Sequence, residues 1–230
     1  MDFDLSAEHQ AIRETARRFV EKELPRQQVL AWVRDKVEPP RELFRKLGKL
    51  GMYGFLIPEE YSGMERPDPI GMIAFVEQLA RASAALTTAY GRAAVILGPL
   101  VANAAGKEHK DRVLPKVMAG ETFMALGLTE PGSGSDAASL RTRAIKQPDG
   151  SFVINGEKMF CTQAQSAEFM VLAARTNPEA VKQEGISLFL IENPGSNPAI
   201  EITRIETMGM AMVPTFAVNF RDLHLPAAAL

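Results

Sequence analysis

The apolar residues of this 230-residue chain change their spacing near Gly120, and this change restricts the possible folds more than any other feature. Before Gly120 they recur at the 3.6-residue period of helices, whereas after it they form short runs separated by turn dipeptides. No helical pattern separates those runs, so a sandwich or barrel is favoured over a parallel α/β sheet. The sequence therefore predicts an α+β protein, with an all-α helical domain at residues 1–121 followed by a β-sandwich or barrel-like domain at residues 122–230.

Five helices are predicted in the N-terminal domain. Ser6 is expected to cap the first helix, and Gly120 to end the last. The residue pair Pro39-Pro40 is expected to begin the second helix, because proline is tolerated in a first turn. The residues that define the five helices are Ile12, Ala16, Phe19 and Val20; Leu43, Phe44, Leu47 and Leu50; Ile70, Ile73, Val76 and Ala80; the run from Leu86 to Ala105; and Val113, Leu114, Val117 and Met118.

Short runs rich in branched and aromatic residues predict the strands of the second domain. The dipeptides Asp149-Gly150 and Asn155-Gly156 are expected to form tight turns. The second of these turns would lead into a strand on which Phe160 and Thr162 share one face. The predicted strands lie at residues 122–129, 151–154, 169–172, 186–191 and 216–220.

Composition and charge narrow the functional classes. With 46% hydrophobic and 23% charged residues, the chain is not mostly disordered. A net charge of -2 gives no basic excess for neutralising phosphates, so nucleic-acid binding is not expected. The single cysteine, Cys161, excludes an intrachain disulfide and suits a reducing compartment, so the cytoplasm is predicted. The apolar runs are shorter than a membrane span, and residues 1–4 do not resemble a signal peptide.

The segment Thr129–Asp136 is the first candidate binding feature. Its glycines, serines and threonine could direct several N–H and hydroxyl donors at a ligand, although a solvent-exposed turn is the simpler interpretation. Gly132, Gly134 and Ala137 formally match a dinucleotide-binding fingerprint. Only about ten residues separate this segment from the next predicted turn, whereas a crossover to a parallel strand needs a dozen or more. The dinucleotide-binding interpretation is therefore rejected.

The second candidate feature is the pair Phe160 and Thr162, which would place an aromatic ring beside a hydroxyl and suit a flat heteroaromatic ligand. A core phenylalanine next to a surface threonine is the alternative. Three scattered histidines show no metal-ligand spacing, and Cys161 is expected to be a buried structural residue. No catalytic residue and no metal site are predicted.

Two segments resemble signatures of the acyl-CoA dehydrogenase family. They are Leu126–Asp136 and Ile154–Thr162. Shorter matches occur at Phe3-Asp4-Leu5, at Ile57–Gly63 and at Phe220–Pro226. The likeness runs in order through the whole chain, and several linked motifs are more specific than one glycine-rich loop.

The resemblance implies that FAD binds to the second domain. The backbone of Leu128 and the hydroxyl of Thr129 would bond the pyrimidine side of the flavin, and Phe160 would pack beside the ring system. Thr162 would reach toward N5, and Ser135 would contact the FAD pyrophosphate or the acyl-CoA substrate. The full set of implied cofactor-binding residues is Leu126, Leu128, Thr129, Gly134, Ser135, Phe160, Cys161 and Thr162.

The resemblance also implies a reaction. Members of the family desaturate an acyl-CoA thioester between its α and β carbons and pass the electrons to an electron-transfer flavoprotein. They end in a four-helix domain that carries the catalytic glutamate and most of the homo-oligomer contact, and this domain is expected to be absent here. The 230-residue chain is therefore expected to bind FAD poorly and to turn over no acyl-CoA.

Two alternatives remain open at this point. The chain could be a non-catalytic or split subunit of a related complex, or it could belong to a related acyl-CoA oxidase or flavin monooxygenase. Two segments also depart from the family pattern. Gln163-Ala164-Gln165 stands where Asn-Gly-Gly is usual, and Gly209-Met210-Ala211 stands where Gly-x-Arg is usual.

Overall fold

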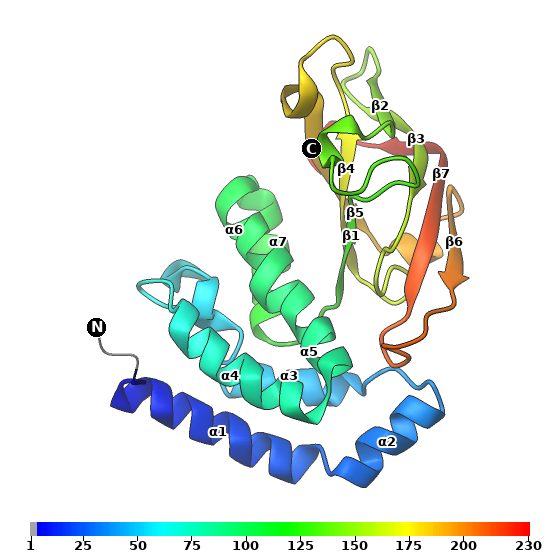
Figure 1. Ribbon diagram of the computed structural model, residues 1–230. Coiled ribbons are helices and arrows are strands. Elements are labelled where there is room, and N and C mark those ends of the chain that lie inside the picture. Colours follow the sequence, from blue (N-terminus) through cyan, green and yellow to red (C-terminus); the bar gives the residue numbers. More distant parts are fainter. Residues whose placement is uncertain (1–3) are drawn as a thin grey trace. The chain divides into compact units, whose positions relative to one another are not determined.

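The computed structural model of the protein describes residues 4–230, so the resemblance at Phe3 and the start of the chain lie outside the described residues. The described chain forms two compact units (Figure 1). One contains the residues up to Thr122 together with Met208–Val213, and the other contains Phe123–Thr207 and Pro214–Leu230. The short segment Met208–Val213 thus groups with the helical unit, although it lies between two strands in the sequence.

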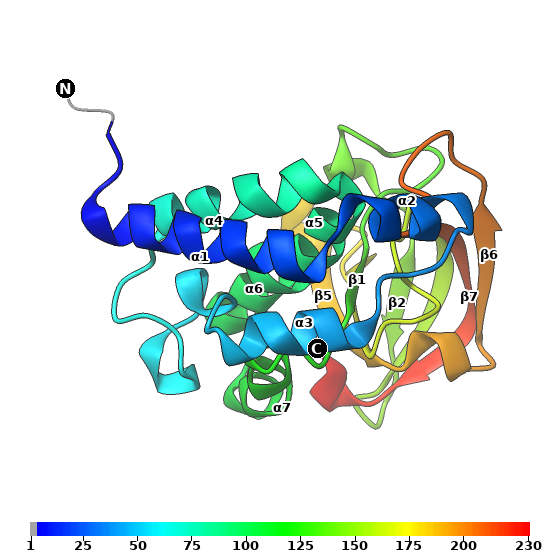
Figure 2. The ribbon, with the colours of Figure 1, turned by 90° about the horizontal axis from the view of Figure 1, so that it is seen from below.

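The first unit is helical. A π-helical segment, Arg92–Leu97, joins α5 to α6 into one continuous helical run. Helices α1 and α4 pack side by side (Figure 2). The helices are α1 (Ala7–Glu23), α2 (Arg26–Arg34), α3 (Arg41–Lys49), α4 (Pro69–Ala82), α5 (Ala84–Gly91), α6 (Gly98–Ala104) and α7 (Lys107–Met118).

Local chemistry sets the ends of these helices. The Ser6 hydroxyl accepts a hydrogen bond from the His9 amide at 3.2 Å, which confirms the predicted cap of α1. Asp68 caps α4 in the same way through the Gly71 amide at 2.8 Å. Gly120 follows α7 with a φ of +65°, and a Cβ there would lie 2.0 Å from the Phe44 carbonyl oxygen. Only glycine fits that position.

The buried faces of the helices differ in part from the prediction. Leu43, Phe44 and Leu47 of α3 are buried as expected, but Leu50 caps the helix and is 44% exposed. Helix α4 forms as predicted, yet Ile70 and Ile73 are each more than half exposed. The smaller residues of α4 allow close packing, and its buried residues are Gly71, Ala74, Phe75 and Leu79.

Helix α2 was not predicted. Val29 is its only buried residue, whereas Leu30 and Val33 are exposed. The helix therefore lacks the broad apolar stripe that makes amphipathic helices recognisable.

One stretch of the described chain, Ala84–Ala104, is long and apolar enough to cross a membrane by length and composition alone. The prediction that every apolar run falls short of a span was therefore too strong. Half of this stretch is buried inside the protein, and core helices pass the same test, so this is weak evidence for a span. Tyr90, within this stretch, stacks at 5.0 Å from Tyr53 and 5.1 Å from Phe75, measured between ring centroids.

The second unit is a curled, mixed seven-stranded sheet, which confirms the predicted barrel-like β-domain (Figure 1). The strand order is β1-β4-β2-β3-β7-β6, and β5 pairs with β4. β1 and β2 each run parallel to β4, whereas the remaining pairs are antiparallel. The strands are β1 (Met124–Gly127), β2 (Arg143–Lys146), β3 (Phe152–Lys158), β4 (Phe169–Arg175), β5 (Ile186–Glu192), β6 (Ile200–Ile205) and β7 (Thr215–Leu225).

The predicted turn at Asn155-Gly156 is wrong, because both residues lie inside β3. The register of β3 against β7 shifts between Ile154 and Gly156, so the dipeptide forms a bulge. The Asn155 side chain bonds both the side chain and the amide of Asp222, each at 2.9 Å. The other predicted turn, at Asp149-Gly150, does connect β2 to β3.

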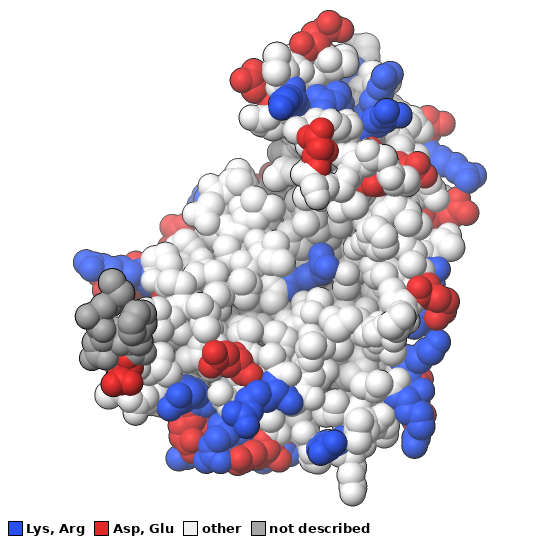
Figure 3. Space-filling view, in the orientation of Figure 1, with Lys and Arg blue, Asp and Glu red and all other residues white. Residues whose placement is uncertain are grey.

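On the face of the molecule shown in Figure 3, charged side chains of both signs occur in small groups, mainly near the edges. The surface drawn there has no large area of a single sign, in keeping with the net charge of -2.

Candidate functional site

All eight predicted site residues lie in the β unit. Leu126 is within β1, and the other seven lie on the segments that follow β1 and β3. Leu128 and Thr129 come directly after β1, and their carbonyl oxygens are held from β3 and the residue after it. Lys158 Nζ donates to the Leu128 carbonyl oxygen at 3.1 Å, and the Met159 amide donates to the Thr129 carbonyl oxygen at 2.7 Å. These two bonds bring the segments after β1 and β3 together.

The loop after Thr129 is closed by its own hydrogen bonds. Glu130 and Ser133 exchange two backbone bonds, at 3.0 and 3.1 Å, and the Ser133 hydroxyl donates to the Asp136 carbonyl oxygen at 2.6 Å. Ser133 is buried, whereas Gly134 and Ser135 are exposed. The loop is therefore a turn closed by its own hydrogen bonds, with Gly134 and Ser135 facing outward. A turn of this kind can also hold a ligand, so the two interpretations of the segment are compatible.

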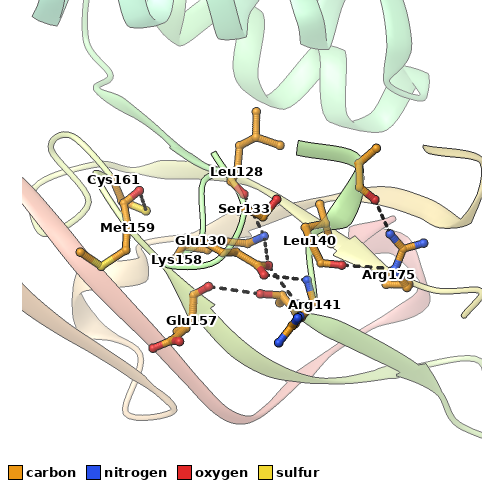
Figure 4. Close-up of polar contacts among 12 residues, drawn as sticks. Leu128, Glu130, Ser133, Leu140, Arg141, Glu157, Lys158, Met159, Cys161 and Arg175 are labelled. Carbon is orange, nitrogen blue, oxygen red and sulfur yellow. Dashed lines mark hydrogen bonds and ion pairs between the residues drawn. The ribbon is translucent and has the colours of Figure 1, made fainter. Parts of the chain in front are cut away.

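The exit of the loop is held by Arg175 of β4. Its guanidinium donates to the carbonyl oxygens of Ala138 at 2.6 Å and Leu140 at 3.3 Å (Figure 4). These bonds anchor the short 3₁₀ turn Ala137–Ser139 that follows the loop.

A buried ion pair lies beneath the loop. Lys158 Nζ and Glu130 Oε1 are 2.7 Å apart, and the two side chains are 0% and 6% exposed (Figure 4). The Glu130 carboxylate also accepts from the amides of Arg141 at 2.6 Å and Thr142 at 2.9 Å. The sequence analysis assigned no role to either residue. The available signal was a lysine next to the apolar segment Met159–Cys161, because a buried lysine needs a partner.

Hydrogen bonding decides the protonation state of Glu130. Burial alone raises the pKa of its carboxyl, but bonds from Lys158 and from the amides of Arg141 and Thr142 outweigh burial and hold that pKa below its ordinary value. Burial lowers the pKa of the Lys158 ammonium, and the bond with Glu130 opposes this effect. The carboxylate form of Glu130 is favoured, and the contact is an ion pair.

Phe160 and Thr162 do not share a strand face, so that prediction is wrong. β3 ends at Lys158, and Phe160 adopts a left-handed conformation with a φ of +58°. Its ring is 57% exposed, whereas Cys161 between them is fully buried and its amide donates to the Phe216 carbonyl oxygen at 2.9 Å. A bulky residue in this conformation is strained, and such strain gathers at functional sites.

Three hydroxyl groups are available to a ligand at this site. Thr129 and Thr162 are half-buried and Ser135 is exposed. Within residues 4–230, the structure shows no hydrogen bond to any of these three hydroxyls, nor to the Thr129 amide. Unused donors on two joined segments, together with an exposed and strained aromatic residue, fit a polar heteroaromatic ligand.

Gln163 is a second residue to which the sequence analysis gave no role. It is fully buried with a φ of +60°, and its side-chain nitrogen and oxygen both lack a hydrogen-bond partner among the described residues. The backbone amide of Gln163 donates to the Pro214 carbonyl oxygen at 2.8 Å. Asparagine tolerates this backbone conformation better than glutamine, so the departure from the family's usual Asn at this position was the available signal.

No group of three or more His, Cys, Asp or Glu residues in the described part of the chain is placed to hold a metal ion. The other departure from the family pattern, at Gly209-Met210-Ala211, lies in the segment that groups with the helical unit. Met208, Met210 and Met212 alternate in the sequence, as residues on one face of an extended segment would. They do not share a face, because Met208 is fully exposed and Met212 is fully buried.

A helical unit followed by a curled mixed sheet matches the acyl-CoA dehydrogenase fold. Butyryl-CoA dehydrogenase from Megasphaera elsdenii matches 100% of this chain with a TM-score of 0.89 and 28% sequence identity, over 59% of its own length. The acyl-CoA dehydrogenase N-terminal domain model matches residues 6–121, and the middle domain model matches residues 125–223. The chain belongs to the acyl-CoA dehydrogenase family.

Two further relatives are informative. Long-chain specific acyl-CoA dehydrogenase, mitochondrial, from Rattus norvegicus is 34% identical over 227 residues, which cover 98% of this chain and 51% of that protein. A solved structure titled "PigA with FAD and proline" matches 100% of this chain and 59% of its own, with a TM-score of 0.88 and 25% identity. The chain spans about half the length of the curated relatives it matches.

Proposed function

We propose that these residues form the N-terminal and middle portion of an enzyme that uses FAD to desaturate an acyl-CoA thioester between its α and β carbons. Family membership and the names of the relatives support the reaction class. The observation that carries the cofactor assignment is the set of unused donors at Thr129 and Thr162, on two joined segments beside the exposed ring of Phe160.

The residues of the site fit the flavin part of FAD by their chemistry. The Leu128 backbone and the Thr129 hydroxyl would donate to the pyrimidine side of the ring, where donors favour the reduced cofactor. Phe160 would pack beside the ring, Thr162 would reach N5, and Ser135 would contact the pyrophosphate or the acyl-CoA. Leu126 and Gly134 would line the site. Cys161 would lie behind it, because the residue is fully buried and its backbone amide already donates to the Phe216 carbonyl oxygen. When bound, FAD supplies the acceptor for the hydride that leaves the substrate.

The partners follow from the same proposal. The substrate would be an acyl-CoA, the electron acceptor an electron-transfer flavoprotein, and the protein a homo-oligomer. The catalytic base would lie outside these 230 residues, in keeping with relatives that are about twice as long. A cytoplasmic location is proposed from the single cysteine alone.

Removing the unused hydroxyls tests the cofactor assignment. In the full-length gene product, Thr129→Val and Thr162→Val should each weaken FAD binding about fivefold to tenfold, because each removes one hydrogen bond. FAD affinity is measured by quenching of flavin fluorescence. Thr203→Val is the matched control, since Thr203 is exposed on β6, a strand that pairs with neither β1 nor β3. Unchanged affinity in both site variants would remove the basis for placing FAD here.

A further inference from the structure

The Lys158–Glu130 ion pair is the most buried charged contact of the β unit, and it lies directly beneath the proposed flavin site. It joins the end of β3 to the first residues of the loop after β1. Lys158 holds two oxygens on this loop, the Glu130 carboxylate and the Leu128 carbonyl. Figure 4 shows the lysine side chain directed at both.

Glu130 in turn fastens the loop to the segment that enters β2. Its two carboxylate oxygens accept from the amides of Arg141 and Thr142, eleven and twelve residues further along the chain. The carboxylate thus connects three separate pieces of backbone: its own loop, the entry to β2 and, through Lys158, the end of β3. Removing either charge would release more than one of them.

A contact of this kind is a poor source of net stability. Burying two charges is costly, and replacing such a pair with apolar residues is often neutral or stabilising. The more distinctive effect of a buried ion pair is on geometry, because each of its hydrogen bonds forms only when donor and acceptor are correctly placed. Here the carbonyls of Leu128 and Thr129 are turned toward β3, so the peptide units that carry them are fixed in orientation.

We propose that the Lys158–Glu130 pair is the positioning element of the proposed flavin site. By holding the Leu128 carbonyl and the base of the loop, it sets the direction of the Thr129 amide and hydroxyl, which are the donors available to the imide edge of the ring. Lys158 and Glu130 are positioning residues and touch no ligand themselves. This inference rests on the proposed function for the identity of the ligand.

Two variants of the full-length gene product separate an effect on the position of the loop after β1 from an effect on the stability of the fold. Lys158→Met alone leaves Glu130 buried without its cation and is expected to fold poorly. The double variant Lys158→Met with Glu130→Gln removes both charges, so its urea midpoint should return close to that of the native protein. Lys146→Met is the matched control, because Lys146 is exposed on β2 of the same sheet.

The double variant still lacks the donor to the Leu128 carbonyl. Its FAD affinity should therefore stay at least about tenfold below native, the loss typical of a hydrogen bond from a charged group. Hydrogen exchange of the Met159 amide, which bonds the Thr129 carbonyl, should be faster by at least about tenfold, while exchange along the β4–β5 ladder stays native. Native FAD affinity and native Met159 exchange in the stable double variant would overturn the proposal.

The two measurements also separate this inference from the proposed function. If the native protein binds no FAD, the proposed function fails, and amide exchange still decides whether the pair positions the loop. If the native protein binds FAD and the double variant binds it equally well, the proposed function stands and the pair has only a structural role.

Discussion

Single residues show most clearly where local chemistry overrides sequence pattern. Asn155-Gly156 has the composition of a hairpin turn, yet its glycine is needed for a different reason. Gly156 has a φ of +150°, and a Cβ there would lie 2.5 Å from the Thr142 hydroxyl oxygen and 2.6 Å from its Cα. The two backbone segments that approach each other, at Gly156 and Thr142, are separated in the sequence. No local pattern could therefore reveal their contact.

Replacing this glycine should therefore be costly. We expect Gly156→Ala to lower the free energy of unfolding by about 2–4 kcal/mol, through backbone strain and overpacking against Thr142. Urea denaturation followed by circular dichroism measures the change. Gly132→Ala is the control, because a Cβ at Gly132 meets nothing within 4 Å and its cost should stay below about 1 kcal/mol. Equal effects of the two substitutions would contradict the account.

Gln163 offers a test in the opposite direction. Gln163→Met keeps the length of the side chain and removes a buried amide that has no partner among the described residues. We expect the free energy of unfolding to rise by about 1–2 kcal/mol, because a buried unsatisfied polar group is destabilising. A clear loss of stability would show instead that the amide is satisfied, for example by an internal water.

At the scale of elements, a helix or strand can be predicted from the sequence when one of its faces is buried, because burial gives it a clear apolar pattern. Helices α1, α3 and α7 and strands β4, β5 and β7 carry clear apolar patterns, and the sequence predicts them. Helix α2 and strand β2 expose most of their residues, and β6 exposes half of its residues, so their patterns are weak. The resemblance to the family predicts that the loops after β1 and β3 form the site, and this stays a prediction. The ion pair that joins the two loops could not be predicted, because its partners lie 28 residues apart.

The joined loops should make the β unit sensitive to acid. The pKa of Glu130 is lower in the folded protein than its ordinary value of 4.5, so its contribution is fully present above pH 4.5 and is lost as the pH falls through the lowered folded value. We expect the urea midpoint of the native protein to fall more steeply between about pH 5 and about pH 3 than that of the double variant Lys158→Met with Glu130→Gln, which carries neither buried charge. Glu157→Gln, an exposed neighbour on β3, is the control and should follow the native curve. Parallel curves for the native protein and the double variant would contradict this assignment.

At the scale of the whole molecule, the assignment to the family is better supported than the role of any single site residue. The two family models together match residues 6–121 and 125–223, in the same order as the helical and β units. The relatives extend well beyond the matched region, since the chain covers 51% of the rat long-chain enzyme. The donors that we propose for the flavin lie within this chain, whereas no described residue is assigned as the catalytic base.

If the proposed site is completed by residues outside this chain, the 230-residue chain alone should keep only part of the FAD affinity. The 230-residue chain on its own should bind FAD at least about tenfold more weakly than the full-length gene product, because fewer contacts surround the cofactor. It should also turn over no acyl-CoA. Side-by-side flavin titration and a dye-reduction assay measure both properties, and turnover by the 230-residue chain alone would contradict the expectation.

The most direct test of the central claim is anaerobic titration of the flavin-loaded, full-length gene product with saturated acyl-CoA thioesters of graded chain length. We expect the flavin absorbance to bleach with at least one thioester and the matching α,β-unsaturated product to appear in equal amount. Subsequent exposure to oxygen distinguishes a dehydrogenase, which reoxidises slowly, from an oxidase, which reoxidises fast. Bound flavin that no acyl-CoA bleaches would contradict the proposed reaction and favour a non-catalytic role.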